Sequence, residues 1–267
     1  MQLDHEQLRQ FDRDGFLILF DLFSPQEVEV IRSRVPGLLA EESEANIVEK
    51  DSGEVRTSMG LHLRDEVFAR LVRHPRLVGP ARQIRPEPLY IQQVKVNVKA
   101  AFSGEVWQWH YDFATHHNDD GVPEPLALNL HIFLDDVTPF NGPLYFIPGS
   151  HRYGAQQAFH DTETTSYPLW VVEDDIVRNL IKEAEKLNSE RGIVAATGRK
   201  GTGLIFVDTL LHGSPNNMSP WDRSIFSLIL NPVSNAYTYN NRPDYKHHRD
   251  LSDVVPLGDN CLNNQED

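Results

Sequence analysis

The stretch "LYIQQVKVNVKAAF", residues 89–102, is decisive for the fold because polar and apolar residues alternate over 93–99. In an extended strand Val94, Val96 and Val98 fall on one face, and Gln93, Lys95, Asn97 and Lys99 fall on the other. On a surface strand the polar face is solvated, which is the usual case. Inside a barrel the same face would line a polar pocket. The rest of the sequence has to distinguish these two interpretations.

Further strand-like segments follow this stretch. Residues 125–137 ("PLALNLHIFLDDV") are apolar on both faces, as in a central strand, and 140–151, 201–214 and 223–234 contain short apolar runs next to turn residues. Residues 171–191 have the pattern of a helical insertion. Helices first and then seven or eight strands predict a mainly β protein with flanking helices and a jelly-roll, cupin-like core.

The chain before the core is predicted to be mainly helical. Ser24 and Glu27 form a capping box with Pro25 at the first helical position, and Pro75 and Pro80 interrupt two short helices. No repeat or linker is visible. We therefore expect a single domain over residues 1–267, with N-terminal helices over 1–87, the jelly-roll core over about 88–235, and an irregular C-terminal tail.

The composition limits the partners of this chain. A net charge of −14 would repel nucleic acid and anionic membrane surfaces, so we expect neither as a partner. The single cysteine, Cys261, excludes an intrachain disulfide and is typical of a reducing compartment. The N-terminus is charged, without the apolar segment of a signal peptide, and no apolar run reaches ~18 residues. We expect a cytoplasmic monomer or homodimer.

A candidate metal site begins in "WQWHYDF", residues 107–113, where His110 and Asp112 are two residues apart. On an extended strand their side chains point the same way and can bind one ion. His212 follows 102 residues after His110, at the end of a predicted strand. Two histidines and one carboxylate form the facial triad of non-haem Fe(II) oxygenases, which leaves positions open for a keto acid and dioxygen.

Arg223 supports the oxygenase interpretation. It follows His212 by eleven residues, at the start of the next predicted strand, and its guanidinium fork can anchor a distal carboxylate. His-x-Asp alone would more often be a hydrogen-bonded pair, with His212 capping a turn. A zinc hydrolase with the same three ligands would give no role to Lys99 and Arg223.

With these residues in place, the chain resembles the phytanoyl-CoA dioxygenase superfamily of Fe(II)- and 2-oxoglutarate-dependent oxygenases, and within it the ectoine hydroxylases. The resemblance rests on several ordered segments. These are "FDRDGFLIL", "YIQQVKVNVKAAFSGEVWQWHYDFATHHNDDGVP", "FNGPLYFIPGSHR", "HGSPNNMSPWDRS" and "RPDYKHHRD". It implies a double-stranded β-helix with N-terminal helices, and Fe(II), 2-oxoglutarate and dioxygen as cofactor and co-substrates.

The resemblance also implies a role for each matching residue. His110, Asp112 and His212 would bind Fe(II); Lys99, Asn97 and Arg223 would hold 2-oxoglutarate; Gln93, His116 and Arg242 would contact the substrate. The stretch "FATHHNDDG", residues 113–121, departs from the ectoine hydroxylases, which have a tryptophan at the position of His116. The aromatic ring that helps to enclose ectoine is therefore absent, while Arg242 still suits a small carboxylated substrate.

The expected reaction is hydroxylation of an aliphatic C–H bond of a small amino acid or amino-acid derivative, with release of succinate and CO2. Alternatives at the same iron site are desaturation and epimerisation in secondary metabolism. An alternative of a different class is a non-catalytic jelly-roll binding protein. Iron content and oxygen-dependent turnover of 2-oxoglutarate would separate this last alternative from the enzymes.

Other polar residues are expected to be structural or peripheral. The expected places are a loop lid for His116 and His117, the packed interior for Trp109 and His131, turns for His151, Asp119 and Asp120, and the solvated tail for His247 and His248.

Overall fold

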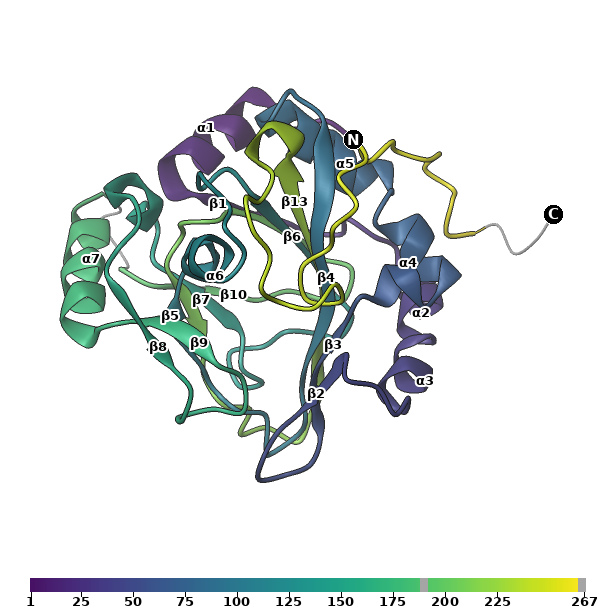
Figure 1. Cartoon of the computed structure of the whole chain (residues 1–267), viewed down its shortest axis with the longest axis horizontal. Helices are drawn as coiled ribbons and strands as arrows, with labels where there is room; N and C mark the ends of the chain where they lie inside the picture. Colours follow the sequence, from purple (N-terminus) through teal and green to yellow (C-terminus); the bar gives the residue numbers. More distant parts are fainter. Residues whose placement is uncertain (188–191, 264–267) are drawn as a thin grey trace.

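The computed structural model describes residues 1–187 and 192–263, which form two main antiparallel sheets and a small hairpin (Figure 1). The larger sheet contains, in spatial order, β1 (Phe16–Leu19), β11 (Gly203–Val207), β6 (Leu128–Phe133), β13 (Arg223–Pro232), β4 (Leu89–Lys99), β3 (Val55–Met59) and β2 (Asn46–Val48). The smaller sheet contains β10 (Val194–Ala196), β7 (Leu144–Phe146), β12 (His212–Ser214) and β5 (Trp107–His110). β8 (Ala158–Asp161) pairs with β9 (Leu169–Val172).

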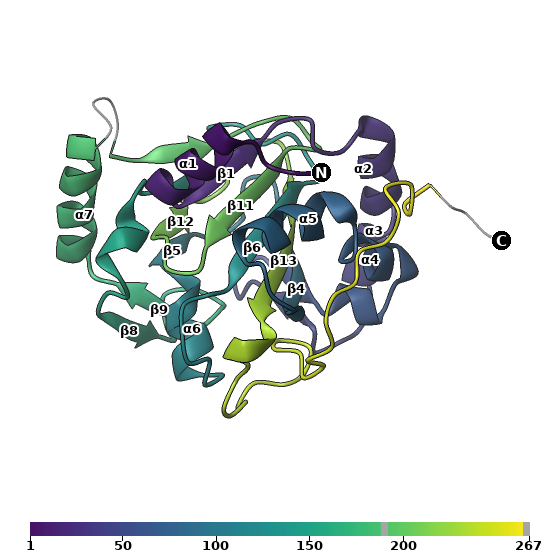
Figure 2. The same cartoon turned by 90° about the horizontal axis from the view of Figure 1, so that it is seen from above.

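The helices lie mainly outside the sheets (Figure 2). They are α1 (His5–Asp14), α2 (Pro25–Arg32), α3 (Val35–Leu39), α4 (Glu66–Leu71), α5 (Pro75–Ile84), α6 (Asp112–Asn118) and α7 (Asp174–Leu187), with short 3-10 turns at Leu61–Leu63, Ser150–Tyr153 and Val233–Asn235. α7 accounts for most of the predicted helical insertion, whose residues 188–191 lie outside the described residues. No helix in the described part of the chain is long and apolar enough to span a membrane.

Local signals explain the first elements. Asp4 and Gln7 form a capping box at the start of α1, and Gly15 ends the helix with φ +83°, a conformation that glycine adopts without steric cost. The predicted capping box of Ser24 and Glu27 at the start of α2 is confirmed. The chain can therefore turn sharply from α1 into β1, which pairs with β11 at the edge of the larger sheet.

The alternation in β4 reflects a barrel wall. Val94 and Val96 are fully buried in the main hydrophobic core, to which the N-terminal helices contribute. Phe68 of α4 stacks on Phe226 of β13 with ring centroids 5.7 Å apart, which fixes helix against sheet. Gln93, Lys95 and Asn97 instead line an internal cavity. Of the two interpretations of this strand, the polar pocket is correct.

Several local predictions were wrong. Pro80 lies inside α5 instead of interrupting it; one backbone hydrogen bond is lost there, but Leu77 and Ala81 pack the same helix into the core. Strands β2 and β3 occur where only helix was expected. The tail beyond residue 243 has no helix or strand in its described part, as predicted, yet it packs against the barrel: His248 N donates to Gln92 O at 2.9 Å.

Candidate metal centre and substrate pocket

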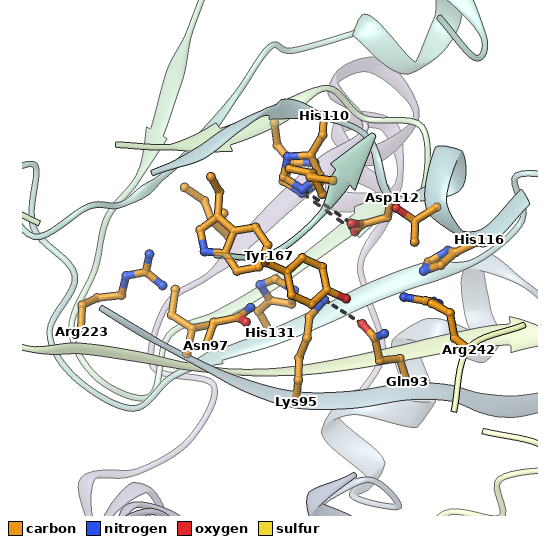
Figure 3. A pocket seen from close by; sticks show the side chains of 16 residues that line it. Gln93, Lys95, Asn97, His110, Asp112, His116, His131, Tyr167, Arg223 and Arg242 are labelled. Atoms are coloured by element: carbon orange, nitrogen blue, oxygen red, sulfur yellow. Dashed lines mark hydrogen bonds and ion pairs between the residues drawn. The ribbon is translucent and has the colours of Figure 1, made fainter. Parts of the chain in front are cut away.

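The smaller sheet places two histidines side by side. His110, at the end of β5, pairs in register with His212, at the start of β12, and their ring centroids are 4.1 Å apart. Asp112 Oδ1 lies 3.7 Å from His110 Nε2, and Asp112 Oδ2 lies 3.9 Å from His212 Nε2. One potential ligand atom of each residue lies within 4.8 Å of the others. The three predicted ligands therefore converge on one point at the cavity wall; Figure 3 shows His110 and Asp112 there.

Hydrogen bonds orient both imidazoles for metal binding. His110 Nδ1 lies 2.6 Å from Gln108 O, and His212 Nδ1 lies 2.9 Å from Leu210 O. A carbonyl only accepts, so each Nδ1 carries the hydrogen and each Nε2 keeps its lone pair for the cluster. This is the arrangement that a metal-binding histidine requires.

The electrostatics of the cluster favour the metal-binding protonation states. Burial lowers the pKa of His110 to about 3, helped by neighbouring His212, so the imidazole is neutral at physiological pH. Burial alone would raise the pKa of Asp112, but its electrostatic interactions with the neighbouring His212 and Lys95 outweigh burial and the net shift is downward. Asp112 is therefore a carboxylate.

Asp112 does not lie on the strand that carries His110. β5 ends at His110, and Asp112 is the first residue of α6. The side chains of His110 and Asp112 still point toward one place, because Tyr111 between them is extended, with φ −132° and ψ 142°. His116 and His117 follow in the same helix, so the expected loop lid is in fact a helix.

One end of the cavity is formed by Arg223 and Asn97. Arg223 is 2% exposed, and its Nη2 donates to Gly142 O at 2.6 Å and to Ser214 Oγ at 3.1 Å. Asn97 Oδ1 accepts from Thr57 Oγ1 at 3.0 Å, which leaves its amide nitrogen for a ligand. These donors suit an anionic group.

Lys99 was expected beside them, but its side chain is not part of the cavity lining. Its Nζ donates to Pro215 O at 2.7 Å and to Glu105 O, and the side chain is almost fully buried. Lys99 pairs in register with Arg223 across β4 and β13, but its ammonium is bonded to these two carbonyls and does not line the cavity.

The opposite end of the cavity holds the three predicted substrate contacts, Gln93, His116 and Arg242 (Figure 3). Arg242 makes a two-pronged ion pair with Asp120, with Nε 2.7 Å from Oδ1 and Nη2 bonded to Oδ2. Gln93 Nε2 donates to Lys246 O at 2.6 Å. Residues of the irregular tail therefore close this end.

His116 is held by an acid that the sequence did not reveal. Its Nδ1 lies 3.0 Å from the Asp208 carboxylate, and both side chains are buried. Burial alone would lower the pKa of His116, but the charge and hydrogen bond of Asp208 outweigh it and the pKa is raised. Asp208 follows β11 in an apolar run, so only the fold connects it to the site.

Three further lining residues were not predicted as site residues. Lys95 could have been inferred from the alternation in β4, because it shares the face of Gln93 and Asn97. His131 was expected in the packed interior, and it is 5% exposed but also borders the cavity. Tyr167 lies between β8 and β9, with its ring 5.4 Å from that of Trp107, and no sequence pattern indicates it.

The remaining expectations divide into confirmed and wrong ones. Trp109 packs against a buried cluster and His151 lies in a 3-10 turn, as expected. His247 and His248 are 0% and 3% exposed, so their predicted solvation was wrong. Asp119 and Asp120 lie in a turn, as expected, and Asp120 is in addition fully buried against Arg242.

The family model for phytanoyl-CoA dioxygenase (PhyH) matches residues 11–225 of this chain. An L-proline trans-4-hydroxylase from Streptomyces griseoviridis is 38% identical over 258 residues, which cover 93% of this chain and 94% of that protein. An ectoine dioxygenase from Nocardia farcinica is 39% identical over 244 residues, which cover 88% of this chain and 80% of that protein.

The fold has a close counterpart among solved structures. EctD from S. alaskensis with 2-oxoglutarate and 5-hydroxyectoine superposes with a TM-score of 0.83 at 33% identity, over 96% of this chain and 88% of that one. EctD with bound Fe gives a TM-score of 0.82. The jelly-roll core expected from the sequence is confirmed, as is the class of enzyme, a dioxygenase. The chain belongs to the phytanoyl-CoA dioxygenase family.

Proposed function

We propose that this chain is an Fe(II)- and 2-oxoglutarate-dependent dioxygenase that hydroxylates an aliphatic C–H bond of a small amino acid or amino-acid derivative, releasing succinate and CO2. One observation carries the proposal. His110, Asp112 and His212 converge on one wall of a cavity, and Arg223 and Arg242 lie at its two ends (Figure 3). The cavity thus offers a metal site between two places for carboxylates.

The three residues fit an iron ion. Both imidazoles present Nε2 to the cluster because their Nδ1 atoms are bound to carbonyls, and Asp112 is ionised. Two imidazoles and one carboxylate suit Fe(II), and they occupy only part of its coordination sphere. The low pKa of His110, about 3, means that no proton has to be displaced from its Nε2 at neutral pH.

Bound iron would supply the activation of dioxygen coupled to oxidative decarboxylation of 2-oxoglutarate, and the protein supplies binding and orientation. Arg223 offers its guanidinium to the distal carboxylate of the co-substrate, next to the amide nitrogen of Asn97. Gln93, His116 and Arg242 receive the polar groups of the substrate at the other end, which leaves its C–H bonds facing the metal cluster.

Two observations favour a free amino acid over ectoine as substrate. The match to the L-proline trans-4-hydroxylase covers 94% of that protein, against 80% for the ectoine dioxygenase from Nocardia farcinica. His116 stands where the sequence resemblance to ectoine hydroxylases has a tryptophan, and it lines the cavity with Arg242 while its Nδ1 lies 3.0 Å from the Asp208 carboxylate. A polar corner of this kind suits an α-carboxylate better than an apolar ring does.

A substrate screen tests the proposal. Purified protein with Fe(II), 2-oxoglutarate and air would be offered L-proline, other free amino acids, N-substituted amino acids and ectoine, and succinate would be quantified. We expect succinate formation to rise with a free amino acid, cyclic ones first, and the product to gain one oxygen atom.

Product mass separates the alternatives, since desaturation removes two hydrogens and epimerisation leaves the mass unchanged. Wild-type protein without an amino acid measures uncoupled turnover, and the variant Asp112→Ala measures succinate formed without the metal site. Absence of 2-oxoglutarate consumption with every compound, in protein that contains iron, would contradict the proposed activity and favour a binding protein.

A further inference from the structure

The inner face of the larger sheet carries a cationic side chain between the two ends of the cavity. Lys95 of β4 pairs in register with Ser227 of β13, which pairs in register with His131 of β6. Lys95 and His131 both line the cavity, and Figure 3 shows Lys95 reaching up from β4 between Asn97 and Gln93. This row lies below the cluster of His110, Asp112 and His212.

Lys95 forms no direct ion pair in the described part of the chain, although the charge of Asp112 acts on it. Its Nζ donates to the neutral Gln93 Oε1 at 2.7 Å, and no carboxylate of the described residues lies within 4.0 Å of it. Its neighbours in the row, Ser227 and His131, supply no negative charge, because a hydroxyl and an imidazole carry none. Ser227 Oγ and His131 Nε2 hydrogen-bond to each other at 2.9 Å. An ammonium withdrawn from solvent without an anionic partner is costly, and burial accordingly lowers the pKa of Lys95.

The cations of the cavity fall into two classes. Arg242 is neutralised by Asp120, and His116 by Asp208. Arg223 resembles Lys95, since within the described chain it bonds only to a carbonyl and a hydroxyl. The end with neutralised donors suits an amino-acid zwitterion, whose net charge is zero. The two cations without carboxylates suit a dianion.

Lys99, the lysine that the family resemblance implies for 2-oxoglutarate, pairs in register with Arg223, but its side chain does not line the cavity. Its stem is enclosed by two glycines: a Cβ added at Gly104 would lie 2.7 Å from Lys99 Cβ, and one added at Gly142 would lie 2.6 Å from Lys99 Cδ. Its Nζ already bonds to two main-chain carbonyls. Lys99 therefore ties two loops to β4 and has no freedom to turn toward the cavity.

We propose that Lys95, and not Lys99, is the second cationic anchor of 2-oxoglutarate, which lies between Lys95 and Arg223 with one carboxylate directed toward each. The inference rests on the proposed function. It assigns Lys95 to the carboxylate nearer the metal cluster and Arg223 to the distal one. The Lys95–Gln93 hydrogen bond then places the co-substrate directly beside the substrate end of the cavity.

The test is an anaerobic titration of 2-oxoglutarate into protein loaded with Co(II), in which isothermal titration calorimetry measures the Kd. The proteins compared are wild type, Lys95→Met, Lys95→Arg and Lys99→Met. The two methionine variants make the same substitution on the same face of one strand. Lys182→Met, at an exposed position of α7, controls for loss of a lysine anywhere. Metal content is measured for each protein, and thermal unfolding checks that each is folded.

We expect Lys95→Met to raise the Kd for 2-oxoglutarate roughly 10- to 100-fold, the range for losing a charged hydrogen bond. Lys95→Arg should stay within about tenfold of wild type, and Lys182→Met should not differ from it. Lys99→Met should lower the melting temperature and leave the Kd within about threefold; if it does not fold, Lys95→Arg and Lys182→Met still complete the comparison.

A Kd for Lys95→Met within about threefold of wild type would overturn the assignment, as would a rise confined to Lys99→Met. So would an unchanged Kd together with a higher KM for the amino acid, which would place Lys95 at the substrate. Failure of the proposed function looks different, because metal-loaded wild type would then not bind 2-oxoglutarate at all.

Discussion

Asp208 holds His116 in place: the Asp208 carboxylate lies 3.0 Å from His116 Nδ1, inside the cavity wall, and neither side chain is more than 3% exposed. The acid comes from the segment after β11 and the imidazole from α6, so this contact joins the larger sheet to the helix that begins at Asp112.

Replacing Asp208 by Asn tests this relationship. The amide keeps the shape but removes the charge that raises the pKa of His116, so the imidazole should titrate at lower pH than in wild type. We expect the KM for the amino acid to rise roughly tenfold at neutral pH while the KM for 2-oxoglutarate is unchanged. Histidine NMR titration and steady-state kinetics check the two effects. An unchanged pKa of His116 would show that Asp208 does not set its charge.

The metal assignment is tested by Asp112→Ala. Removing the only carboxylate of the cluster should lower the iron content of the purified protein and abolish succinate formation, because two histidines alone hold Fe(II) weakly. Elemental analysis and succinate assays measure both, with Asp175→Ala on exposed α7 as the matched control. Activity that survives Asp112→Ala unchanged would refute the three-ligand site.

Arg242 should be needed for the planar geometry of its guanidinium as well as for its positive charge. Arg242→Lys cannot reproduce the two-pronged contact with Asp120, which is fully buried. We expect a loss of about 2–4 kcal/mol in the free energy of unfolding and a higher KM for the amino acid. Urea denaturation and kinetics provide the measurements. The double variant Arg242→Lys, Asp120→Asn should recover part of the stability, and failure to do so would mean that the ion pair is not the cause.

Stability should fall in acid through Glu27. Burial alone would raise its pKa, but hydrogen bonds from Arg76 and Ser24 hold the pKa of Glu27 at about 2. A carboxyl with a depressed pKa stabilises the fold above its ordinary value of 4.5, and this contribution is lost as pH falls toward 2. Allowing for solvent screening at Arg76, we expect Glu27→Gln to cost about 1 kcal/mol at pH 7. Urea denaturation at several pH values should show this difference shrinking below pH 4.5.

The parts of the fold that the sequence predicted are those with local signals. The alternation in β4 and the capping box of α2 are short-range patterns, and the two motifs of the proposed iron site lie at strand ends. β3 was missed because it contains Arg56, a charged residue whose burial is compensated mainly by contacts distant in the sequence, among them the ion pair with Glu105 and the ring of Trp107. Composition cannot reveal such a pairing.

The candidate site shows the same division. The alternation placed Lys95 and Lys99 on one face of one strand, but Gly104 and Gly142 decide which of them reaches the cavity. The burial of His248 likewise depends on the tail crossing β4, which no periodicity announces. The features that the sequence did not predict depend on packing between segments distant in the chain, and residue type alone does not indicate them.

The C-terminal tail contributes to the substrate end of the cavity but not to the metal cluster. The proposed metal ligands come from β5, β12 and the start of α6, whereas Arg242 and the carbonyl of Lys246 come from an irregular segment. Part of the proposed substrate pocket is thus encoded apart from the metal ligands. Changes in that segment could alter the choice of substrate while the three ligands are inherited unchanged, which offers a route by which one scaffold diversifies.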